Sequence, residues 1–320
     1  MHEKFRAIFI GMSTENHRTE PHTFFHQSVL LSQCIDALNV TSGGVYIDAT
    51  LGGGGHSLAI LQKAPNVRLF GIDRDPEAIK AAQARLAPYR DQCTFLLGTF
   101  ADKLSDIDEP IDGMLFDLGV SSPQLDHAHR GFSFSHSGPL DMRMNQQEGI
   151  SAQEFINKIT QEELANIIFH YGEEPRSRRI AKAICEQRPF PDTIALAECV
   201  RISSGYKQSR THPATRTFQA IRIAINQELQ QIEKALPKAL SLLKPYGRLA
   251  VISFHSLEDR IVKSFFQNAI GKNAPKDAYG NPMVPPQALP VSFKGIEGKK
   301  EDPNNPRARS ARLRVISKNP

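Results

Sequence analysis

Residues 47–61 read IDATLGGGGHSLAIL and place four consecutive glycines between two apolar runs. Glycine loses more backbone entropy on folding than any other residue, so four in a row are costly in a regular element. Such a loop is favoured where a ligand approaches the backbone closely, or where the chain turns with no room for a side chain. The flanking apolar runs predict a buried strand before the loop and a helix after it. The stretch therefore predicts a ligand site at a strand–loop–helix junction.

Composition places the chain among globular proteins. It has 320 residues, 40% hydrophobic content and a formal net charge of +5, which is compatible with an anionic partner such as nucleic acid. No apolar run approaches the roughly 20 residues of a membrane helix. The four cysteines are scattered without metal-ligand spacing. We therefore expect reduced thiols, no bound metal, no membrane partner and a cytoplasmic location.

Strands and helices alternate over the first part of the chain. Apolar runs predict strands at 45–50, 67–73, 93–100 and 111–120, and helical periodicity separates the first three of them. Asp75 followed by Pro76 is a helix start signal. This alternation predicts an α/β fold with a mostly parallel, doubly wound, Rossmann-like sheet.

The alternation stops after residue 120 and resumes near residue 215. The intervening segment predicts several short helices, and then a long helix over 215–243 with a break or kink at Pro237. A fifth strand at 247–255 and a closing strand at 311–317 follow, with a long loop between them that contains one candidate strand at 290–295. We therefore expect a disordered arm at 1–21, a core of 22–125 and 215–320, and a helical insert at 126–214.

Acidic and aromatic residues stand where the predicted strands end. These are Asp48, Asp73, Phe100 and Asp117, and ligands of doubly wound sheets bind at this edge. The glycine loop lacks the lysine of a phosphate-binding P-loop. A dinucleotide cofactor remains an alternative, but S-adenosylmethionine fits better because its ammonium and sulfonium groups favour acids. We expect Asp73 to bind its ribose and Phe100 to stack on its adenine.

The segment after Asp117 resembles the loop that amino-methyltransferases place against an exocyclic amine. Acceptors at Asp117, Ser121, or the backbone of Ser122 and Pro123 are candidates for positioning the amine of cytosine or adenine. Methyl transfer is an in-line displacement, so we expect these groups to act by positioning and electrostatics.

Aromatic and basic residues interleave beyond this loop. Such a pattern suits stacking on an extruded base and binding of phosphates. The alternative is that the two phenylalanines seal the junction with the insert. Following the fifth strand, His255 faces the same crevice and is a candidate for a structural or substrate-orienting role. The candidate RNA-binding residues are Arg130, Phe132, Phe134, Arg143, Arg216 and His255, with further arginines at 176, 178, 179, 222, 307, 309 and 312.

Long motifs carry a resemblance to a known family. YIDATLGGGGHS, DGMLFDLGVSSPQLD, HPATRTFQAIRIAIN and GRLAVISFHSLEDRIVK together closely resemble the ribosomal RNA small subunit methyltransferase H family, also called MraW. The resemblance covers about His26 to Arg314. The departures are the extension before His22 and the glycine at position 53.

The resemblance implies methylation of N4 of a cytidine in the decoding region of bacterial small-subunit ribosomal RNA. The partner would be that RNA, within a ribosomal particle, and a homodimer is compatible with the sequence. The alternatives are a nicotinamide-dependent oxidoreductase and a catalytically silent ribosome-binding module. The resemblance implies that S-adenosylmethionine is bound by Gly54, Gly55, His56, Asp73, Phe100, Asp117 and Gln124.

Overall fold

The computed structural model describes residues 28–205, 212–275, 277, 279 and 283–320. The arm expected at 1–21 lies outside these residues. Among the described helices, none combines the length and the apolar character that crossing a membrane requires.

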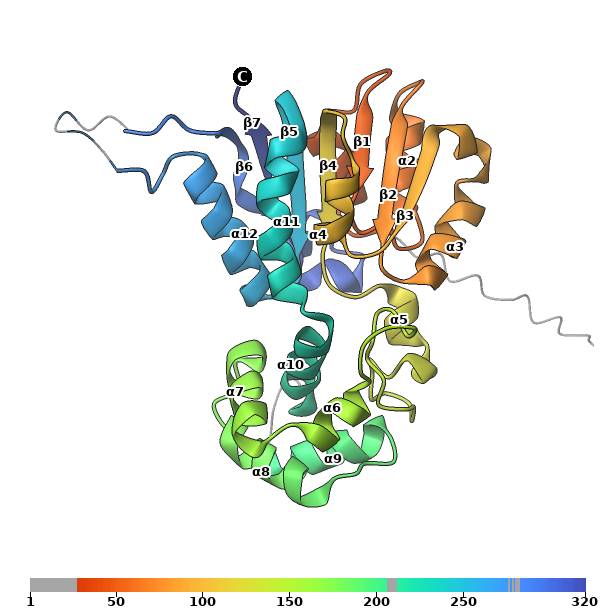
Figure 1. Ribbon diagram of the computed structural model, residues 1–320, viewed down its shortest axis with the longest axis vertical. Coiled ribbons are helices and arrows are strands. Elements are labelled where there is room, and N and C mark those ends of the chain that lie inside the picture. Colours follow the sequence, from red (N-terminus) through yellow and green to blue (C-terminus); the bar gives the residue numbers. More distant parts are fainter. Residues whose placement is uncertain (1–27, 206–211, 276, 278, 280–282) are drawn as a thin grey trace, which may run out of the picture.

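A seven-stranded sheet forms the upper part of the molecule in Figure 1, with strand order β3-β2-β1-β4-β5-β7-β6. The five strands from β3 to β5 are parallel, whereas β7 runs antiparallel to both β5 and β6. This confirms the predicted mostly parallel sheet. The strands are β1 (Val45–Asp48), β2 (Arg68–Asp73), β3 (Cys93–Leu97), β4 (Ile111–Asp117), β5 (Leu243–Ser253), β6 (Ala288–Glu297) and β7 (Arg312–Lys318).

Helices cover both faces of the sheet and bury two separate apolar layers. One layer packs the sheet against α4, α11 and α12, and the other packs it against α1, α2 and α3. Continuous burial along β1 explains its uninterrupted apolar sequence. These helices are α1 (Leu31–Leu38), α2 (Gly55–Lys63), α3 (Pro76–Arg85), α4 (Phe100–Lys103), α11 (Glu228–Leu242) and α12 (Ser256–Ala269), and the short elements are η1 (Ala87–Gln92), η2 (Leu104–Asp106), α13 (Gly298–Glu301) and η4 (Pro306–Ser310).

The helical insert has an apolar core of its own and lies at the edge of the sheet where the parallel strands end. A short α5 (Ser122–Asp126) and η3 (Ala128–Arg130) lead into it. Its remaining helices are α6 (Ala152–Lys158), α7 (Gln161–Gly172), α8 (Ser177–Gln187), α9 (Thr193–Ser204) and α10 (Ala214–Asn226).

The long helix expected over 215–243 is two helices, and the predicted break at Pro237 is wrong. The chain breaks at Gln227, whose φ of 52° is left-handed, while Pro237 stays within α11 on its exposed face. The break sends Phe218 and Ile221 of α10 into the core of the insert and Ile232 of α11 against the sheet. One apolar stripe in the sequence therefore serves two cores.

Buried Asn226 fixes the break between α10 and α11. Its Nδ2 donates to the carbonyl of Met142 at 2.8 Å, and its Oδ1 accepts from the N–H of Met144 at 2.9 Å. Arg74, which follows β2, donates to the carbonyl of Asn226 at 2.8 Å. The hinge between insert and sheet is therefore tied to both.

Candidate active site at the carboxyl ends of the strands

Three aspartates lie at one edge of the sheet because their strands are parallel neighbours. Asp48 of β1 is in register with Gly71 of β2 and with Leu115 of β4. Asp73 and Asp117, each two residues further along, therefore flank it at the same edge. The sequence predicted this convergence from the order of the elements.

The four glycines of the loop between β1 and α2 differ in their backbone conformation and in the space around them. Gly52 has a φ of +49° and donates its N–H to Asp73 at 2.8 Å. A Cβ on Gly55 would lie 2.1 Å from the Ser28 hydroxyl, and one on Gly54 would press on Ala82 at 3.3 Å. A Cβ on Gly53, in contrast, would meet no atom within 4 Å. The loop is thus closely packed on α3 and open at Gly53.

Asp73 accepts two backbone hydrogen bonds that hold its carboxylate in place. Its Oδ2 binds the N–H of Gly52 at 2.8 Å and its Oδ1 that of Asp75 at 2.9 Å. Burial raises the pKa of Asp73 to about 6, against the lowering effect of these two bonds. Each carboxylate oxygen keeps a second lone pair, which a ribose hydroxyl can use.

Asp117 is the acceptor with spare capacity at the end of β4. Its Oδ1 is buried and has no hydrogen-bond partner in the described part of the chain. Burial raises its pKa to about 6, while nearby His56 lowers it and Asp48 and Glu258 raise it. An orphaned carboxylate oxygen at a strand end is costly unless a ligand satisfies it.

His56 lies beside Asp117 at the start of α2. Its Nδ1 is 3.7 Å from Asp117 Oδ2, and its Nε2 lies 3.0 Å from the carbonyl of Val29. Donation from Nε2 to that carbonyl leaves Nδ1 facing the carboxylate. The third aspartate, Asp48, is 1% exposed and accepts a hydrogen bond from the Ser57 hydroxyl at 2.7 Å. This bond connects the end of β1 to α2.

Gln124 and Asp75 join the loop after β4 to the start of α3. Gln124 Oε1 accepts from the N–H of Ser121 at 3.0 Å, and its Nε2 donates to Asp75 at 2.9 Å. Asp75 also caps α3 through the N–H of Glu77, which confirms the predicted helix start. Both ends of the Gln124 amide are engaged, so this side chain positions the loop in the present structure.

Ser121, Ser122 and Pro123 form the first turn of α5, directly beyond Asp117. Ser121 is its N-cap and Pro123 lies in its first turn, while the Ser122 side chain is buried. Phe100, at the start of α4, packs edge-to-face on Phe116 of β4 at 5.3 Å. The roles expected for these four residues stay predictions.

Two of the predicted RNA contacts are wrong, because their side chains are buried. Arg130 is 1% exposed, and its guanidinium binds Asp75 at 2.8 Å and the carbonyl of Met144 at 2.8 Å. Phe132 is buried in the core of the insert. Phe132 therefore agrees with the alternative, in which the phenylalanines pack at the junction with the insert and do not contact RNA.

The other predicted RNA residues differ in how accessible they are. Phe134 is partly buried and packs on Phe218 and His212, both at 4.8 Å. Arg143 forms an ion pair with Asp141 at 2.8 Å. Arg216 is half exposed and lies 3.4 Å from buried Glu174. Among these residues Arg216 is the most accessible.

His255 belongs to a polar network that its place after the fifth strand did not predict. It is the N-cap of α12, where Glu258 Oε2 accepts from its N–H at 3.3 Å. Its Nε2 lies 3.2 Å from Glu258 Oε1, and both atoms lack a hydrogen bond in the described residues. Arg222, another expected RNA contact, is instead held by Glu228 at 2.8 Å. The spacing His-x-x-Glu is a capping-box pattern that would have revealed this pair.

Known proteins match this chain over nearly its whole length. Residues 23–319 match the MraW methylase family. The chain belongs to this family. A ribosomal RNA small subunit methyltransferase H of Trichormus variabilis is 46% identical over 308 residues, which cover 96% of each chain. One of Acinetobacter baumannii is 47% identical over 301 residues, or 92% of this chain and 97% of the relative.

A solved structure of an rRNA methylase from Streptococcus thermophilus is also similar. It is 12% identical, with a TM-score of 0.39 over 91% of this chain and 94% of the other. The family and its relatives identify this chain as a methyltransferase that uses S-adenosylmethionine. The acids at the strand ends and the open face of the glycine loop fit that cationic cofactor.

Proposed function

We propose that this methylase transfers the methyl group of S-adenosylmethionine to N4 of a cytidine in the decoding region of bacterial small-subunit ribosomal RNA. The names of the relatives support ribosomal RNA as the substrate. The observation that carries the reaction site is Asp117, whose buried Oδ1 has no partner in the described residues. The Asp117 side chain is 25% exposed, so a carboxylate with this spare acceptor capacity is suited to accept a hydrogen bond from an exocyclic amine.

Asp117 would act on the amine by holding one of its N–H groups. The cytosine N4 lone pair is delocalised into the ring, and an acceptor at N–H draws electron density back toward nitrogen. S-adenosylmethionine, when bound, supplies a methyl group on a sulfonium leaving group. Asp117 then contributes orientation and electrostatic stabilisation, the two effects that dominate in-line transfers.

The cofactor would lie between the glycine loop and the ends of β2 and β4. The open side of Gly53 permits a ligand to approach that backbone. Asp73 is placed to accept from ribose hydroxyls, and Asp117 and His56 border the methyl-donating end. We propose Gly54, Gly55, Phe100 and Gln124 as further contacts of this pocket.

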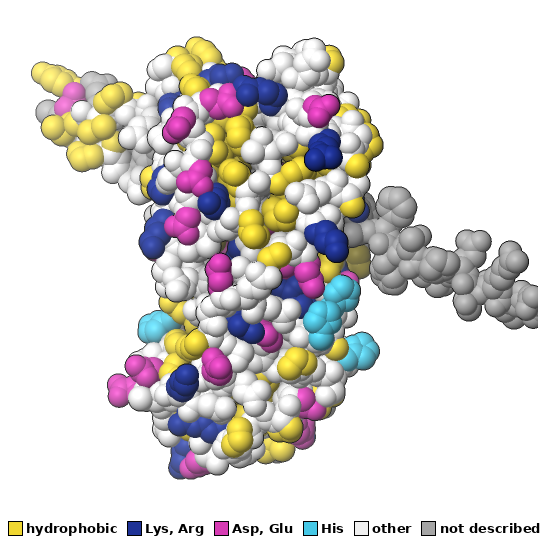
Figure 2. All heavy atoms as spheres, turned by 45° about the vertical axis from the view of Figure 1, so that its right-hand side comes forward, with side chains coloured by type: hydrophobic (Ala, Val, Ile, Leu, Met, Phe, Trp, Pro, Cys, Tyr) yellow, Lys and Arg dark blue, Asp and Glu magenta, His cyan; other side chains and the backbone are white. Residues whose placement is uncertain are grey.

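The insert offers an exposed surface suited to the RNA backbone. A hollow of about 810 Å³ at the start of α8 is lined by Phe169, His170, Arg178 and Arg179, and Phe169 is 52% exposed. Figure 2 shows dark-blue Lys and Arg side chains on the lower, helical part of the molecule. Arginines beside an exposed aromatic ring suit single-stranded RNA, which is bound through phosphates and stacked bases.

The natural substrate would be a small-subunit ribosomal particle in the bacterial cytoplasm. Comparing methyl transfer to the particle with transfer to naked ribosomal RNA tests this part of the proposal. Higher activity on naked RNA would contradict it. A homodimer is compatible with the sequence, and light scattering of the purified chain would distinguish monomer from dimer mass.

The experiment that tests the activity is nucleoside mass spectrometry of small-subunit ribosomal RNA from a strain that lacks the gene. We expect N4-methylcytidine to be absent from the decoding region. Complementation with the wild-type gene should restore it, whereas Asp117→Ala, expressed to the same level, should not. Persistence of N4-methylcytidine in the deletion strain, or full restoration by Asp117→Ala, would overturn the proposal.

A further inference from the structure

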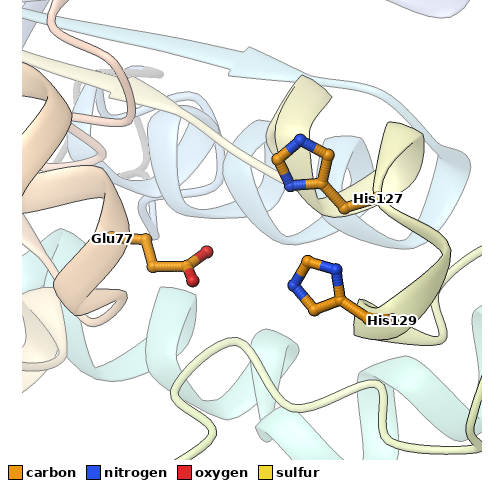
Figure 3. A group of neighbouring side chains, drawn as sticks. All are labelled: Glu77, His127 and His129. Atoms are coloured by element: carbon orange, nitrogen blue, oxygen red, sulfur yellow. The ribbon is translucent and has the colours of Figure 1, made fainter.

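Three side chains outside the proposed pocket converge on one point of the surface. Glu77 lies in the first turn of α3, His127 joins α5 to η3, and His129 lies within η3. One ligand atom of each lies within 4.8 Å of the others. Figure 3 shows the Glu77 carboxylate directed toward the two imidazole rings. Residues far apart in the sequence are thus brought together at the junction between core and insert.

The two imidazoles are available to a ligand. Their rings stack with centroids 5.4 Å apart and planes inclined by 21°. Both residues are exposed, and no ring nitrogen of either histidine forms a hydrogen bond with another described residue. Ring nitrogens without protein partners are free to bind an ion.

Arg130 orients the carboxylate that faces these rings. Its Nη1 donates to Glu77 Oε2 at 3.1 Å, and the same nitrogen donates to Asp75 at 2.8 Å. Because Arg130 is buried, this contact fixes the approach of an otherwise exposed side chain. Metal-binding carboxylates commonly receive such a hydrogen bond from a second layer of residues.

We propose that Glu77, His127 and His129 bind a divalent transition-metal ion, with zinc as the representative metal and water completing its coordination. Two imidazoles and one carboxylate are ligands typical of zinc, whereas magnesium and calcium prefer oxygen alone. Zinc bonds of about 2.0–2.2 Å require the three ligand atoms to approach one another by roughly 1 Å or more. Exposed side chains can make this movement by rotation.

The site would connect α3 of the core with the segment that enters the insert. The metal would therefore reinforce the Gln124–Asp75–Arg130 network, which already joins these elements. An ion that binds only the folded protein raises its stability in proportion to the logarithm of metal concentration. The sequence predicted no metal, because Glu77 comes from a different element and no spacing relates it to the two histidines.

The test is calorimetric titration of the untagged full-length chain with ZnCl2. Wild type should bind one more equivalent of zinc than His127→Ala/His129→Ala. The matched control is His136→Ala/His170→Ala, which removes two exposed histidines from other parts of the insert and should bind as wild type does. Equal stoichiometry in all three proteins would overturn the proposal.

A second readout separates metal binding from a folding defect. Cobalt(II) should give visible absorption from a low-coordinate nitrogen–oxygen site in wild type and in the control, and this band should be lost in His127→Ala/His129→Ala. Glu77→Gln should weaken zinc binding at least tenfold, while affinity for S-adenosylmethionine stays unchanged in every variant. Binding of zinc by Glu77→Gln with wild-type affinity and an unchanged cobalt spectrum would contradict the assignment of Glu77.

Discussion

The edge of the sheet and the insert use their charged residues in opposite ways. At the sheet edge the aspartates are buried or half-buried, and Asp73 and Asp117 can each accept a further hydrogen bond. Burial disfavours their charged form and raises the pKa of both to about 6. In the insert the arginines divide into two groups. Arg130 and Arg222 are held by carboxylates, whereas Arg178 and Arg179 lie exposed. Charge alone therefore does not show which residues meet a ligand; what separates them is whether the protein already supplies each charge with its partner.

The largest expected effect comes from removing the buried arginine. Arg130→Ala leaves Asp75 buried without its cation, which costs about 3–5 kcal/mol of unfolding free energy. Arg178→Ala, an exposed arginine, should change it by less than about 0.5 kcal/mol. Urea unfolding followed by circular dichroism measures both. Equal losses would erase the distinction between the two kinds of arginine.

The next effect concerns cofactor affinity. Asp73→Asn keeps the shape of the side chain but removes the charged acceptor for the ribose hydroxyls, so we expect S-adenosylmethionine to bind about 10–100-fold more weakly. Calorimetry measures the dissociation constant, and the thermal midpoint of the variant serves as the folding control. A dissociation constant equal to that of wild type would remove Asp73 from the pocket.

The raised pKa values also predict how pH acts on this site. Asp73 and Asp117 hold their protons up to about pH 6 in the folded chain, well above the ordinary carboxyl value. Their contribution to stability is therefore greatest at low pH and is lost as the pH rises through about 6. The affinity for the cofactor should change with pH in the opposite direction and rise as the pH increases through about 6, because binding requires the carboxylate form. Affinity should fall about tenfold per pH unit below this value for each carboxylate required, and Asp73→Asn should show a shallower dependence.

The smallest effect is expected on the exposed surface of the insert. Arg178→Glu/Arg179→Glu should weaken binding to a decoding-region RNA roughly tenfold and reduce the slope of affinity against salt by about one to two. The matched control is Lys234→Glu/Lys263→Glu, which makes the same charge change on the exposed surface of the core. Filter binding at several salt concentrations measures both affinities. Equal loss of RNA affinity in the two double variants would show that only net charge matters.

The sheet edge could be predicted from the sequence because its geometry follows from the order of the elements. Parallel strands bring their carboxyl ends together, so Asp48, Asp73 and Asp117 converge whatever the loops do. Arg130 could not be assigned in the same way. Its partner Asp75 lies 55 residues away, and an arginine between aromatic residues has the same local pattern whether it faces RNA or a buried carboxylate.

The hinge shows a second limit of local pattern. Periodicity continues through Gln227, and Pro237 gives the stronger local signal for a break. The structure breaks at Gln227 because α10 and α11 serve different cores and Asn226 is held by Met142 and Met144. A tertiary contact thus overrides a propensity, and nothing in the neighbouring residues encodes it.

The most direct test of the division between the two regions is to measure both affinities on the same preparations of Asp73→Asn and Arg178→Glu/Arg179→Glu. We expect Asp73→Asn to lose S-adenosylmethionine binding and keep RNA binding, and the double arginine variant to do the reverse. Parallel loss of both affinities in either variant would contradict a cofactor site on the sheet and an RNA surface on the insert.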